Sequence, residues 1–255
     1  MEKSTTSAVS PASDLMAKYY GSRPGWIDGT TQFRGMIERH LTPLSQVLDI
    51  GAGSGRQSHF HYSGKVARFV GIDVSDEVLQ NPNLDEAFCC DAAKMPFPDN
   101  SFDIVFSDYV FEHLPEPDRA VQEIFRVLKP GGRFFVRTPN KWHYVPIIAR
   151  LLPDKTHPGL LDGLAIRNQE DVFPKHYLAN TAARVRKIFL AAGFQIAELN
   201  LIEKEPLYLV NWPPLFSIAV AYERLINSSE KLRFLRANIL GTFLKPEQET
   251  ARYSS

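Results

Sequence analysis

The chain has little cysteine and no segment of the kind that directs export. Its 255 residues include only two cysteines, the neighbours Cys89 and Cys90, which cannot cross-link distant segments and therefore predict a reducing compartment. Residues 1–13 have no apolar stretch behind a basic start, so we expect a mobile tail and not a signal peptide. The cytoplasm is the expected location.

Charge imbalance and long apolar runs are also absent. Lys plus Arg equals Asp plus Glu at 29 each, so no overall positive field would gather the phosphates of a nucleic acid. The most apolar later stretch, 207–220, is interrupted by Asn211, Pro213 and Pro214 and is shorter than the roughly 20 residues that span a bilayer. We expect no nucleic-acid partner and no transmembrane segment; peripheral contact with a membrane stays open.

Short β-rich runs alternate with helical segments between residues 46 and 137, which is typical of a parallel sheet covered on both faces. Apolar residues recur at helical spacing in 121–128 and 185–192. These patterns predict one helix that stops at 129–132 and another that begins near Asn180 or Thr181 and ends at Gly193. The expected strands are 46–50, 68–73, 87–91, 102–107, 133–137 and 194–202.

A glycine-rich turn follows the first strand. The segment runs Asp49-Ile50-Gly51-Ala52-Gly53-Ser54-Gly55, and glycines are needed where a ligand approaches the backbone closely or where φ is positive. A dinucleotide-binding turn would place a third glycine where Arg56 stands. Asp49 would repel a diphosphate, yet it suits a ligand that carries an ammonium group. The alternative is an ordinary glycine turn beside a chance acid.

Residues 49–55 resemble motif I of the class I S-adenosylmethionine-dependent methyltransferases. A D-A-x-x-x-P-F element at 91–97, before the S-F-D-x-V strand 101–105, is typical of the branch that includes the ubiquinone and menaquinone biosynthesis methyltransferases. The matches cover about 44–140. The resemblance implies an α/β fold, a Rossmann-like three-layer sandwich whose seven-stranded sheet is mostly parallel, with one antiparallel strand near its edge and helical cap insertions.

The resemblance also implies the cofactor S-adenosylmethionine and the residues that bind it. Asp73 would bind the ribose with Val74 bordering the adenine, whereas Asp91 would accept from the adenine amino group. The alternatives are that Asp73 caps a helix beginning near Ser75 or Asp76 and that Asp91 is a turn residue. The complete predicted set is Asp49, Gly51, Ala52, Gly53, Asp73, Val74, Asp91, Ala92 and Ser107, the last at the end of the fourth strand.

A sulfonium methyl group is already activated, so catalysis would rest mainly on positioning the acceptor in line with it. A general base is needed only where the acceptor loses a proton. His113 is the candidate base because it follows the fourth strand, near the carboxyl edge where open α/β sheets bind ligands. Its alternative is a histidine packed beside the next helix or bonded to Glu112. Tyr109 is a candidate for lining the pocket.

Residues 14–250 are expected to form a single domain, with a core at about 44–140 and 180–204 and a last strand at 238–245. Two insertions, 140–179 and 205–237, are here called the cap, and both leave the sheet at its carboxyl edge. Their aromatic residues Trp142, Tyr144 and Trp212 would suit an apolar or amphipathic small-molecule acceptor. The alternative is a cap with its own small core. His143 and His176 are candidate substrate contacts, and no histidine spacing indicates a metal site.

Three other functions are compatible with parts of the sequence. An NAD-dependent oxidoreductase is disfavoured by Asp49 and by the missing third glycine. A base-flipping N-methyltransferase would often carry an Asn- or Asp-Pro-Pro-aromatic motif where Ser107-Asp108-Tyr109-Val110 stands. A non-catalytic S-adenosylmethionine-binding subunit that supports a partner enzyme remains the serious rival, because methyl transfer requires no invariant catalytic side chain.

Overall fold

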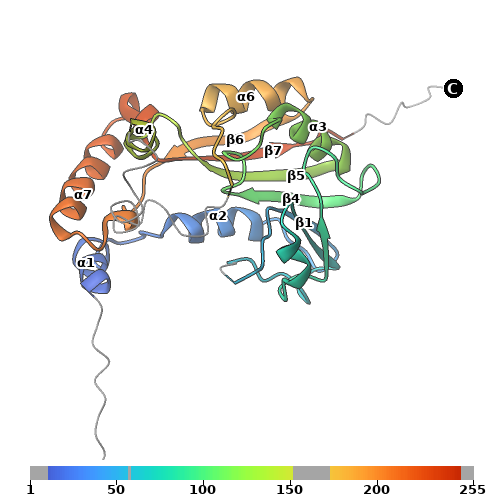
Figure 1. Cartoon of the computed structure of the whole chain (residues 1–255), viewed down its shortest axis with the longest axis horizontal. Coiled ribbons are helices and arrows are strands. Elements are labelled where there is room, and N and C mark those ends of the chain that lie inside the picture. Colours follow the sequence, from blue (N-terminus) through green and yellow to red (C-terminus); the bar gives the residue numbers. More distant parts are fainter. Residues whose placement is uncertain (1–10, 57–58, 152–172, 248–255) are drawn as a thin grey trace, which may run out of the picture.

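The structure is a computed structural model that describes residues 11–56, 59–151 and 173–247. One seven-stranded sheet runs through the molecule in the order β3-β2-β1-β4-β5-β7-β6 (Figure 1). The strands are β1 (Gln46–Ile50), β2 (Arg68–Asp73), β3 (Glu86–Cys89), β4 (Phe102–Asp108), β5 (Leu128–Pro139), β6 (Gln195–Ile202) and β7 (Asn238–Leu244).

The sheet is mostly parallel, as the sequence predicted. β1 pairs in parallel with β2 and β4, β2 pairs with β3, and β4 pairs with β5. β7 lies antiparallel between β5 and β6. Because the other strands share one direction, the loops that follow β1, β2, β3 and β4 meet at one edge of the sheet, where ligands bind in open α/β folds.

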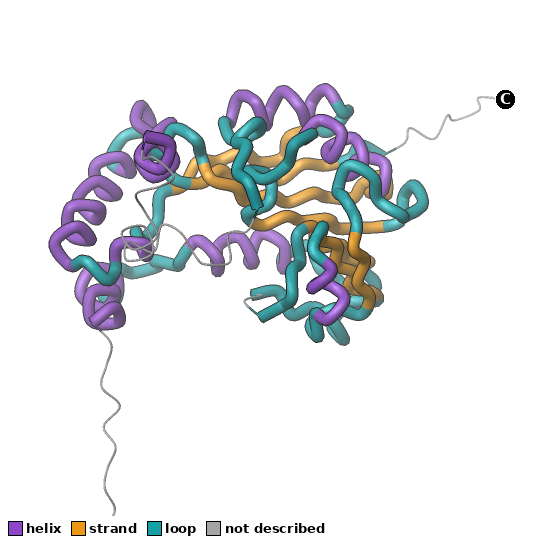
Figure 2. The backbone as a smooth tube through the Cα atoms, in the orientation of Figure 1, coloured by secondary structure: helices purple, strands orange, loops and turns teal. Residues whose placement is uncertain are grey.

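Helices cover both faces of this sheet, which gives the three layers expected. α3 (Pro117–Val127) and α6 (Ala182–Ala191) lie on one face and α2 (Gly29–Glu38) on the other (Figures 1 and 2). The central strands have buried side chains on both faces, as parallel strands between helices do. In β1 these are Val47 on the α2 side and Leu48 and Ile50 on the α3 side.

Several element bounds differ from those expected. β3 is Glu86–Cys89 and not 87–91, and β5 begins at Leu128 and not at 133. The Lys-Pro-Gly-Gly segment 129–132 does end α3, but it is an irregular part of β5, where the register against β4 shifts. Gly131 has φ +77°, which lets the backbone form the irregularity without breaking the strand.

Aromatic side chains, and not a helix, fill the space beside β1 and β2 in the described residues between these strands. Residues 59–67 contain turns and no helix. Phe60 and Tyr62 fill the space with their rings, at centroid distances of 4.7 Å from Phe60 to Phe106 and 5.4 Å from Tyr62 to Phe69. This segment has few apolar residues for a helix, and two aromatic side chains supply the buried surface.

The cap stands at the carboxyl edge with a core of its own, in which Tyr20, Phe216 and Val220 are buried together. Residues 11–13 belong to a helix, so the expected tail 1–13 is too long at its carboxyl end; residues 1–10 and 152–172 lie outside the described residues. The cap elements are α4 (Tyr144–Leu151), η2 (Leu207–Leu209), α7 (Pro213–Asn227) and η3 (Glu230–Leu235), and α1 (Pro11–Tyr20) packs against them.

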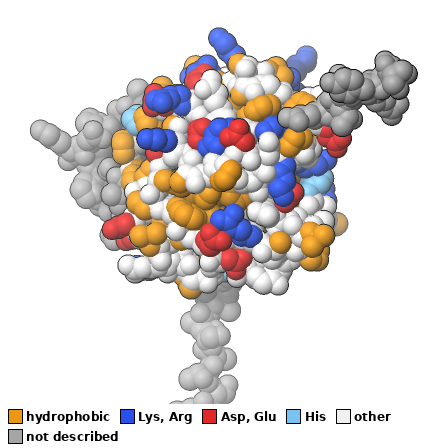
Figure 3. Space-filling view, turned by 90° about the vertical axis from the view of Figure 1, so that its right-hand side faces the viewer, with side chains coloured by type: hydrophobic (Ala, Val, Ile, Leu, Met, Phe, Trp, Pro, Cys, Tyr) orange, Lys and Arg blue, Asp and Glu red, His pale blue; other side chains and the backbone are white. Residues whose placement is uncertain are grey.

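The opposite end of the molecule carries the loops that precede the parallel strands. Figure 3 shows that basic and acidic side chains alternate there around a central group of hydrophobic ones. In the part of the chain that the structure describes, no helix combines the length and the apolar character needed to cross a bilayer.

Candidate active site

A pocket of about 440 Å³ opens at the carboxyl edge of the sheet. It is lined by the loops after β1, β2, β3 and β4 and by residues 173–176 of the cap. Eight residues predicted from the sequence line it together: Gly51, Asp73, Val74, Asp91, Ala92, Tyr109, His113 and His176. A larger hollow of about 790 Å³ lies between α2 and the β6–β7 face, but none of the predicted site residues lines it.

The other four predicted cofactor residues, Asp49, Ala52, Gly53 and Ser107, do not line the pocket. Asp49 and Ser107 are buried in β1 and β4, and the Ser107 Oγ atom has no hydrogen-bond partner. A direct contact of these four residues with a ligand stays a prediction. Their positions beside the glycine turn fit a role in shaping the floor of the pocket.

The glycine turn has a geometry that side chains would block. Gly51 has φ +81°, and a Cβ atom there would lie 2.1 Å from Cγ2 of Val110. At Gly55, φ is +77° and a Cβ atom would lie 2.2 Å from Oδ1 of Asn81. Both positions therefore require glycine because of φ and of neighbouring side chains.

Two asparagines that the sequence analysis did not single out hold this turn. Nδ2 of Asn81 donates to the carbonyls of Ala52 and Gly53 at 3.0 and 3.1 Å. Nδ2 of Asn83 donates to the carbonyl of Gly55 at 3.0 Å. Their sequence, Asn-Pro-Asn, indicates a turn, but only the fold shows that it packs against the glycines.

Asp73 braces the same turn from the end of β2. Its Oδ2 accepts from the amide of Gly53 at 3.0 Å, and its Oδ1 accepts from the amide of Ser75 at 2.9 Å. The alternative role as a helix cap falls to Ser75, whose hydroxyl accepts from the amide of Glu77 at the start of η1 (Asp76–Gln80). Two ionised carboxylate oxygens offer about four acceptor positions, so Asp73 can brace the turn and still accept from a ligand.

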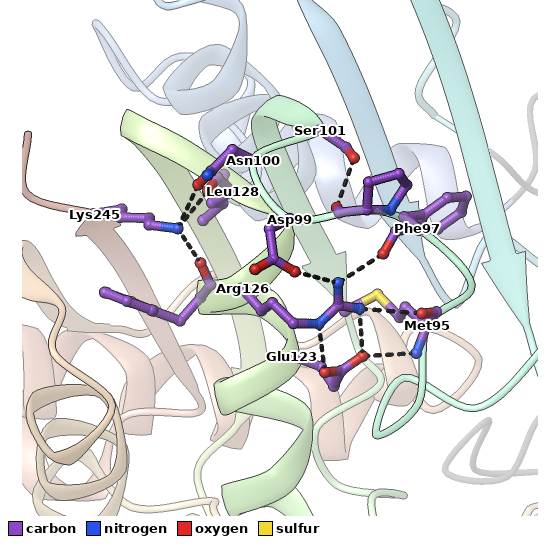
Figure 4. Close-up of polar contacts among 11 residues, drawn as sticks. Met95, Phe97, Asp99, Asn100, Ser101, Glu123, Arg126, Leu128 and Lys245 are labelled. Carbon is purple, nitrogen blue, oxygen red and sulfur yellow. Dashed lines mark hydrogen bonds and ion pairs between the residues drawn. The ribbon is translucent and has the colours of Figure 1, made fainter. Parts of the chain in front are cut away.

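The loop after Asp91 is held by α3, as Figure 4 shows. Arg126 donates to the carbonyls of Phe97 and Met95 at 2.6 and 3.1 Å, and Glu123 accepts from the amide of Met95 at 2.9 Å. Arg126 and Glu123 are themselves paired at 2.8 Å. This clamp fixes the loop that carries Asp91 and Ala92 to the pocket wall.

Acidic groups crowd the floor of the site. Burial, followed by the charges of Asp108 and Asp73, raises the pKa of Asp49 well above its usual range. A buried carboxyl surrounded by acids favours the proton-bound form until a cation approaches. The site is therefore matched to a positively charged ligand and not to a diphosphate.

One buried ion pair joins the ends of β4 and β5. Arg137 binds both oxygens of Asp108 at 2.6 and 2.7 Å, and its guanidinium donates to the hydroxyl of Thr30 at 3.1 Å. The same guanidinium lies 4.7 Å from the ring centroid of Tyr109. Arg137 therefore fixes both Asp108 and Tyr109, two residues that line the pocket.

Tyr109, the candidate pocket residue, has an uncommon backbone. Its φ is +57°, a conformation that costs an aromatic residue energy and that often occurs at functional sites. The hydroxyl of Tyr109 donates to Oδ1 of Asn238 at 3.1 Å, and its amide donates to the carbonyl of Arg137 at 2.9 Å. These bonds hold the ring at the pocket wall.

His113 contacts the cap. Nδ1 of His113 lies 3.2 Å from the carbonyl of Pro174, and because a carbonyl only accepts, Nδ1 carries the proton and Nε2 is the basic nitrogen of the neutral ring. His176 lines the same pocket, whereas His143 is buried beside Glu203 with Nε2 and Oε1 3.4 Å apart. The structure therefore brings His113 and His176 together and places His143 elsewhere.

The cap aromatics that suggested an acceptor pocket do not line it. Trp142 and Trp212 are exposed, and Tyr144 pairs with Tyr208 inside the cap. Among the described residues, the cap supplies the pocket with Phe173, Pro174 and His176. Aromatic content alone could not distinguish side chains that pack within the cap from those that face the site.

Glu112, next to His113, is a buried acid. Burial raises its pKa from 4.5 to about 7, although its carboxylate accepts from the hydroxyl of Thr138 at 3.1 Å. The folded protein therefore keeps this proton up to about pH 7, whereas the unfolded chain releases it near pH 4.5. This difference lowers the stability of the fold as pH rises through that window.

We expect Glu112→Gln to flatten the pH dependence of stability. The wild type should lose up to about 3 kcal/mol of unfolding free energy between pH 4.5 and pH 7 on account of this group, and the glutamine variant should lose correspondingly less. Urea unfolding at pH 5 and pH 8 measures, for each protein, the slope of the unfolding free energy against pH. Equal slopes for the two proteins would show that Glu112 is ionised throughout.

Within the described ranges, no group of three or more His, Cys, Asp or Glu side chains is arranged to hold a metal ion.

Comparison with known proteins identifies the core. A family model described as "Methyltransferase domain" matches residues 48–136, the segment that supplies the glycine turn, Asp73, Asp91 and His113. Residues 48–136 are similar to this family of methyltransferase domains. A ubiquinone/menaquinone biosynthesis C-methyltransferase of Burkholderia cenocepacia is 31% identical over 157 residues, which cover 57% of this chain and 63% of that protein. The match thus spans less than two thirds of that relative.

Solved structures show that the whole fold, and not only the methyltransferase domain, has counterparts. An S-adenosylmethionine-dependent methyltransferase from Mesorhizobium loti aligns with a TM-score of 0.54 at 17% identity and covers 84% of this chain and 96% of that one. The [4+2]-cyclase SpnF aligns with a TM-score of 0.58 at 21% identity and covers 93% of both chains. At such identities the likeness shows the fold alone.

Proposed function

We propose that this protein transfers the methyl group of S-adenosylmethionine to a small apolar or amphipathic acceptor, by O- or C-methylation. The observation that carries the proposal is the pocket that unites Gly51, Asp73 and Asp91 with His113 at the edge of the methyltransferase domain. The two adjacent free cysteines favour the cytoplasm as the place of action.

The residues present fit this cofactor, which supplies an activated methyl group when bound. Asp73 has acceptor capacity beyond its two backbone bonds for the hydroxyls of a ribose. Asp91, whose Oδ1 accepts from the amide of Ala93 at 2.8 Å, is on the pocket wall and can accept from an adenine amino group. The buried acid Asp49 would lose its proton as a cationic amino-acid group approaches and would then supply a matching negative charge.

The side chains proposed to contact the methyl acceptor are aromatic rings and imidazoles. Tyr109 and Phe173 offer apolar surface, and His113 and His176 offer nitrogen atoms that bind or accept protons. His113 is the proposed base because its Nδ1 contact with Pro174 orients the ring and directs basicity to Nε2. Its contribution depends on an acceptor that loses a proton, such as a hydroxyl.

The second candidate is a cofactor-binding protein that does not transfer the methyl group. One structural neighbour of the same fold is a [4+2]-cyclase, so the fold alone does not determine which reaction is catalysed. The pocket supports cofactor binding equally under both candidates. Only the appearance of a methylated product separates them.

We expect the purified protein to bind S-adenosylmethionine and S-adenosylhomocysteine, but not NAD, in calorimetry. A product screen with labelled methyl groups against quinols, phenols, glycolipid precursors and small acids tests methyl transfer.

With a hydroxyl acceptor, His113→Gln should lower kcat by about 10²–10⁴ without changing cofactor affinity. Phe173→Ala should raise the acceptor KM, with Trp212→Ala as a control outside the pocket.

Tight NAD binding without binding of the sulfonium compound would refute the proposal. Binding of S-adenosylmethionine with no product from any acceptor class would favour the non-catalytic candidate. Should His113→Gln turn over a hydroxyl acceptor at the wild-type rate, the base lies elsewhere in the pocket.

A further inference from the structure

Helix α7 of the cap is apolar over more of its circumference than it buries. Its inner side consists of Phe216, Ala219, Val220, Glu223 and Ile226. A second row, Leu215, Ile218, Ala221 and Leu225, recurs every three or four residues and therefore forms one flank of the helix. This flank faces outward: Ile218 is 66% exposed and Leu225 is 61% exposed.

The exposed flank continues onto neighbouring elements. Tyr222 of α7 packs edge-on against Tyr144 of α4, with ring centroids 4.8 Å apart, and its hydroxyl donates to the carbonyl of Leu235 in η3 at 2.9 Å. Figure 1 shows α4, η3 and α7 together at the end of the molecule that holds the cap. We define the outer cap face as the exposed side chains Trp142, Ile147, Ile148, Leu215, Ile218, Leu225 and Phe234.

The exposed hydrophobic side chains of the protein are concentrated in the cap. Nine of the seventeen large hydrophobic side chains that are exposed in the described residues lie in 140–151 and 205–237, the outer cap face plus Leu207 and Trp212. These segments are a minor part of the described chain. Exposed apolar side chains gathered on neighbouring elements in this way mark a contact surface for a protein, a membrane or a ligand.

The charge of the same segments selects among these partners. They contain six basic residues and three acidic ones in a chain with no net charge, and one of the acids, Glu223, is buried and paired with Arg23 at 3.2 Å. Lys141 lies 5.4 Å from the ring centroid of Trp142. The Arg233 side chain next to Phe234 is 64% exposed and forms a long, exposed ion pair with Glu230 at 4.0 Å. Apolar side chains bordered by cations, with tryptophan among them, are typical of helices that lie in the interface of an anionic bilayer.

We propose that the outer cap face docks on an anionic lipid surface. Apolar residues of α7 and α4 enter the headgroup boundary, while Lys141, Lys231 and Arg233 bind the lipid phosphates. This inference goes beyond the proposed function, because it concerns where the protein acts and needs no cofactor. It also fits an acceptor that is itself amphipathic, since the cap lies beside the pocket.

Co-sedimentation of the full chain with vesicles tests the docking. We expect the protein to bind vesicles of phosphatidylglycerol and phosphatidylcholine, to bind pure phosphatidylcholine vesicles at least tenfold more weakly, and to be released by high salt. Lys231→Glu with Arg233→Glu should weaken binding at least 20-fold, because each lost basic side chain alone accounts for about fivefold. Ile218→Glu with Leu225→Glu should abolish binding.

Two control variants carry the same kinds of substitution outside the cap. Leu44→Glu with Leu190→Glu changes two exposed leucines outside the cap, and Arg186→Glu with Lys187→Glu reverses two exposed charges on α6. Both control proteins should bind as the wild type does. Absence of binding to anionic vesicles, or equal losses in the controls, would overturn the proposal.

The other occupant of this face would be a second copy of the chain. Light scattering at micromolar concentration distinguishes it: a dimer that Ile218→Glu with Leu225→Glu converts to a monomer would overturn membrane docking in favour of self-association. Vesicle binding is measured without S-adenosylmethionine or acceptor. Its failure would therefore leave the proposed methyl transfer untouched, and loss of methyl transfer would leave docking untouched.

Discussion

Asp73→Ala is expected to weaken binding of S-adenosylmethionine about 100-fold. The variant would lose two charge-assisted hydrogen bonds to the ribose, about 3 kcal/mol in total. It would also lose the bond to the amide of Gly53, which loosens the glycine turn before any ligand arrives. Calorimetry of the wild type and the variant measures the ratio of dissociation constants.

Ser75→Ala is the matched control, because Ser75 caps η1 two residues later. Loss of a serine cap costs about 1 kcal/mol of stability, so the melting temperature should fall while cofactor affinity stays unchanged. Asp73→Ala also loses the bonds to the amides of Gly53 and Ser75, so its melting temperature should fall too, but it alone should weaken cofactor binding. If Asp73→Ala lowers the melting temperature and binds the cofactor normally, Asp73 is a structural residue only.

Arg137→Met should be the most destabilising single change in the site. Arg137 and Asp108 are 5% and 15% exposed in their side chains, and they share two hydrogen bonds. Removing one partner of a buried pair costs about 3–5 kcal/mol, because the other charge stays buried alone. We expect the melting temperature to fall by roughly 10 °C, as measured by calorimetry.

A double variant separates the buried charge from the lost packing. Arg137→Met with Asp108→Asn removes both charges and should recover most of the lost stability. Arg119→Met breaks the exposed pair with Glu116 and should cost less than about 1 kcal/mol. No recovery in the double variant would mean that the ring contacts of Arg137, and not its charge, stabilise this edge.

Local sequence predicted the parts of the fold that depend on neighbours along the chain. β1 and β2 were placed to the residue, and the start of α6 was predicted from Thr181, whose hydroxyl accepts from the amide of Arg184. The glycine turn, Asp73 and Asp91 were predicted because their spacing follows the strands. In each case the signal lies within a few residues.

Contacts between distant segments were not predictable in this way. Asn81 bonds to carbonyls 28 and 29 residues away, and Arg137 reaches Thr30 across 107 residues. Phe60 and Tyr62 bury their rings against Phe106 and Phe69 from a segment without a helix, because a core is filled by volume and not by one kind of element. Which cap aromatics face the pocket likewise depends on tertiary packing, so the sequence left open whether Trp142 and Tyr144 line the pocket or belong to the cap alone.

The junction between α1 and α7 sets an order of events during synthesis. Arg23 pairs with Glu223, and the hydroxyl of Tyr19 bonds to that of Ser217, across about 200 residues in each case. At roughly 5–20 residues per second, the ribosome needs about 10–40 s to supply α7 after α1 has emerged. During that time the apolar side chains of α1 lack their partners Phe216 and Val220 on α7, so this segment of the nascent chain is expected to be open to chaperones and proteases.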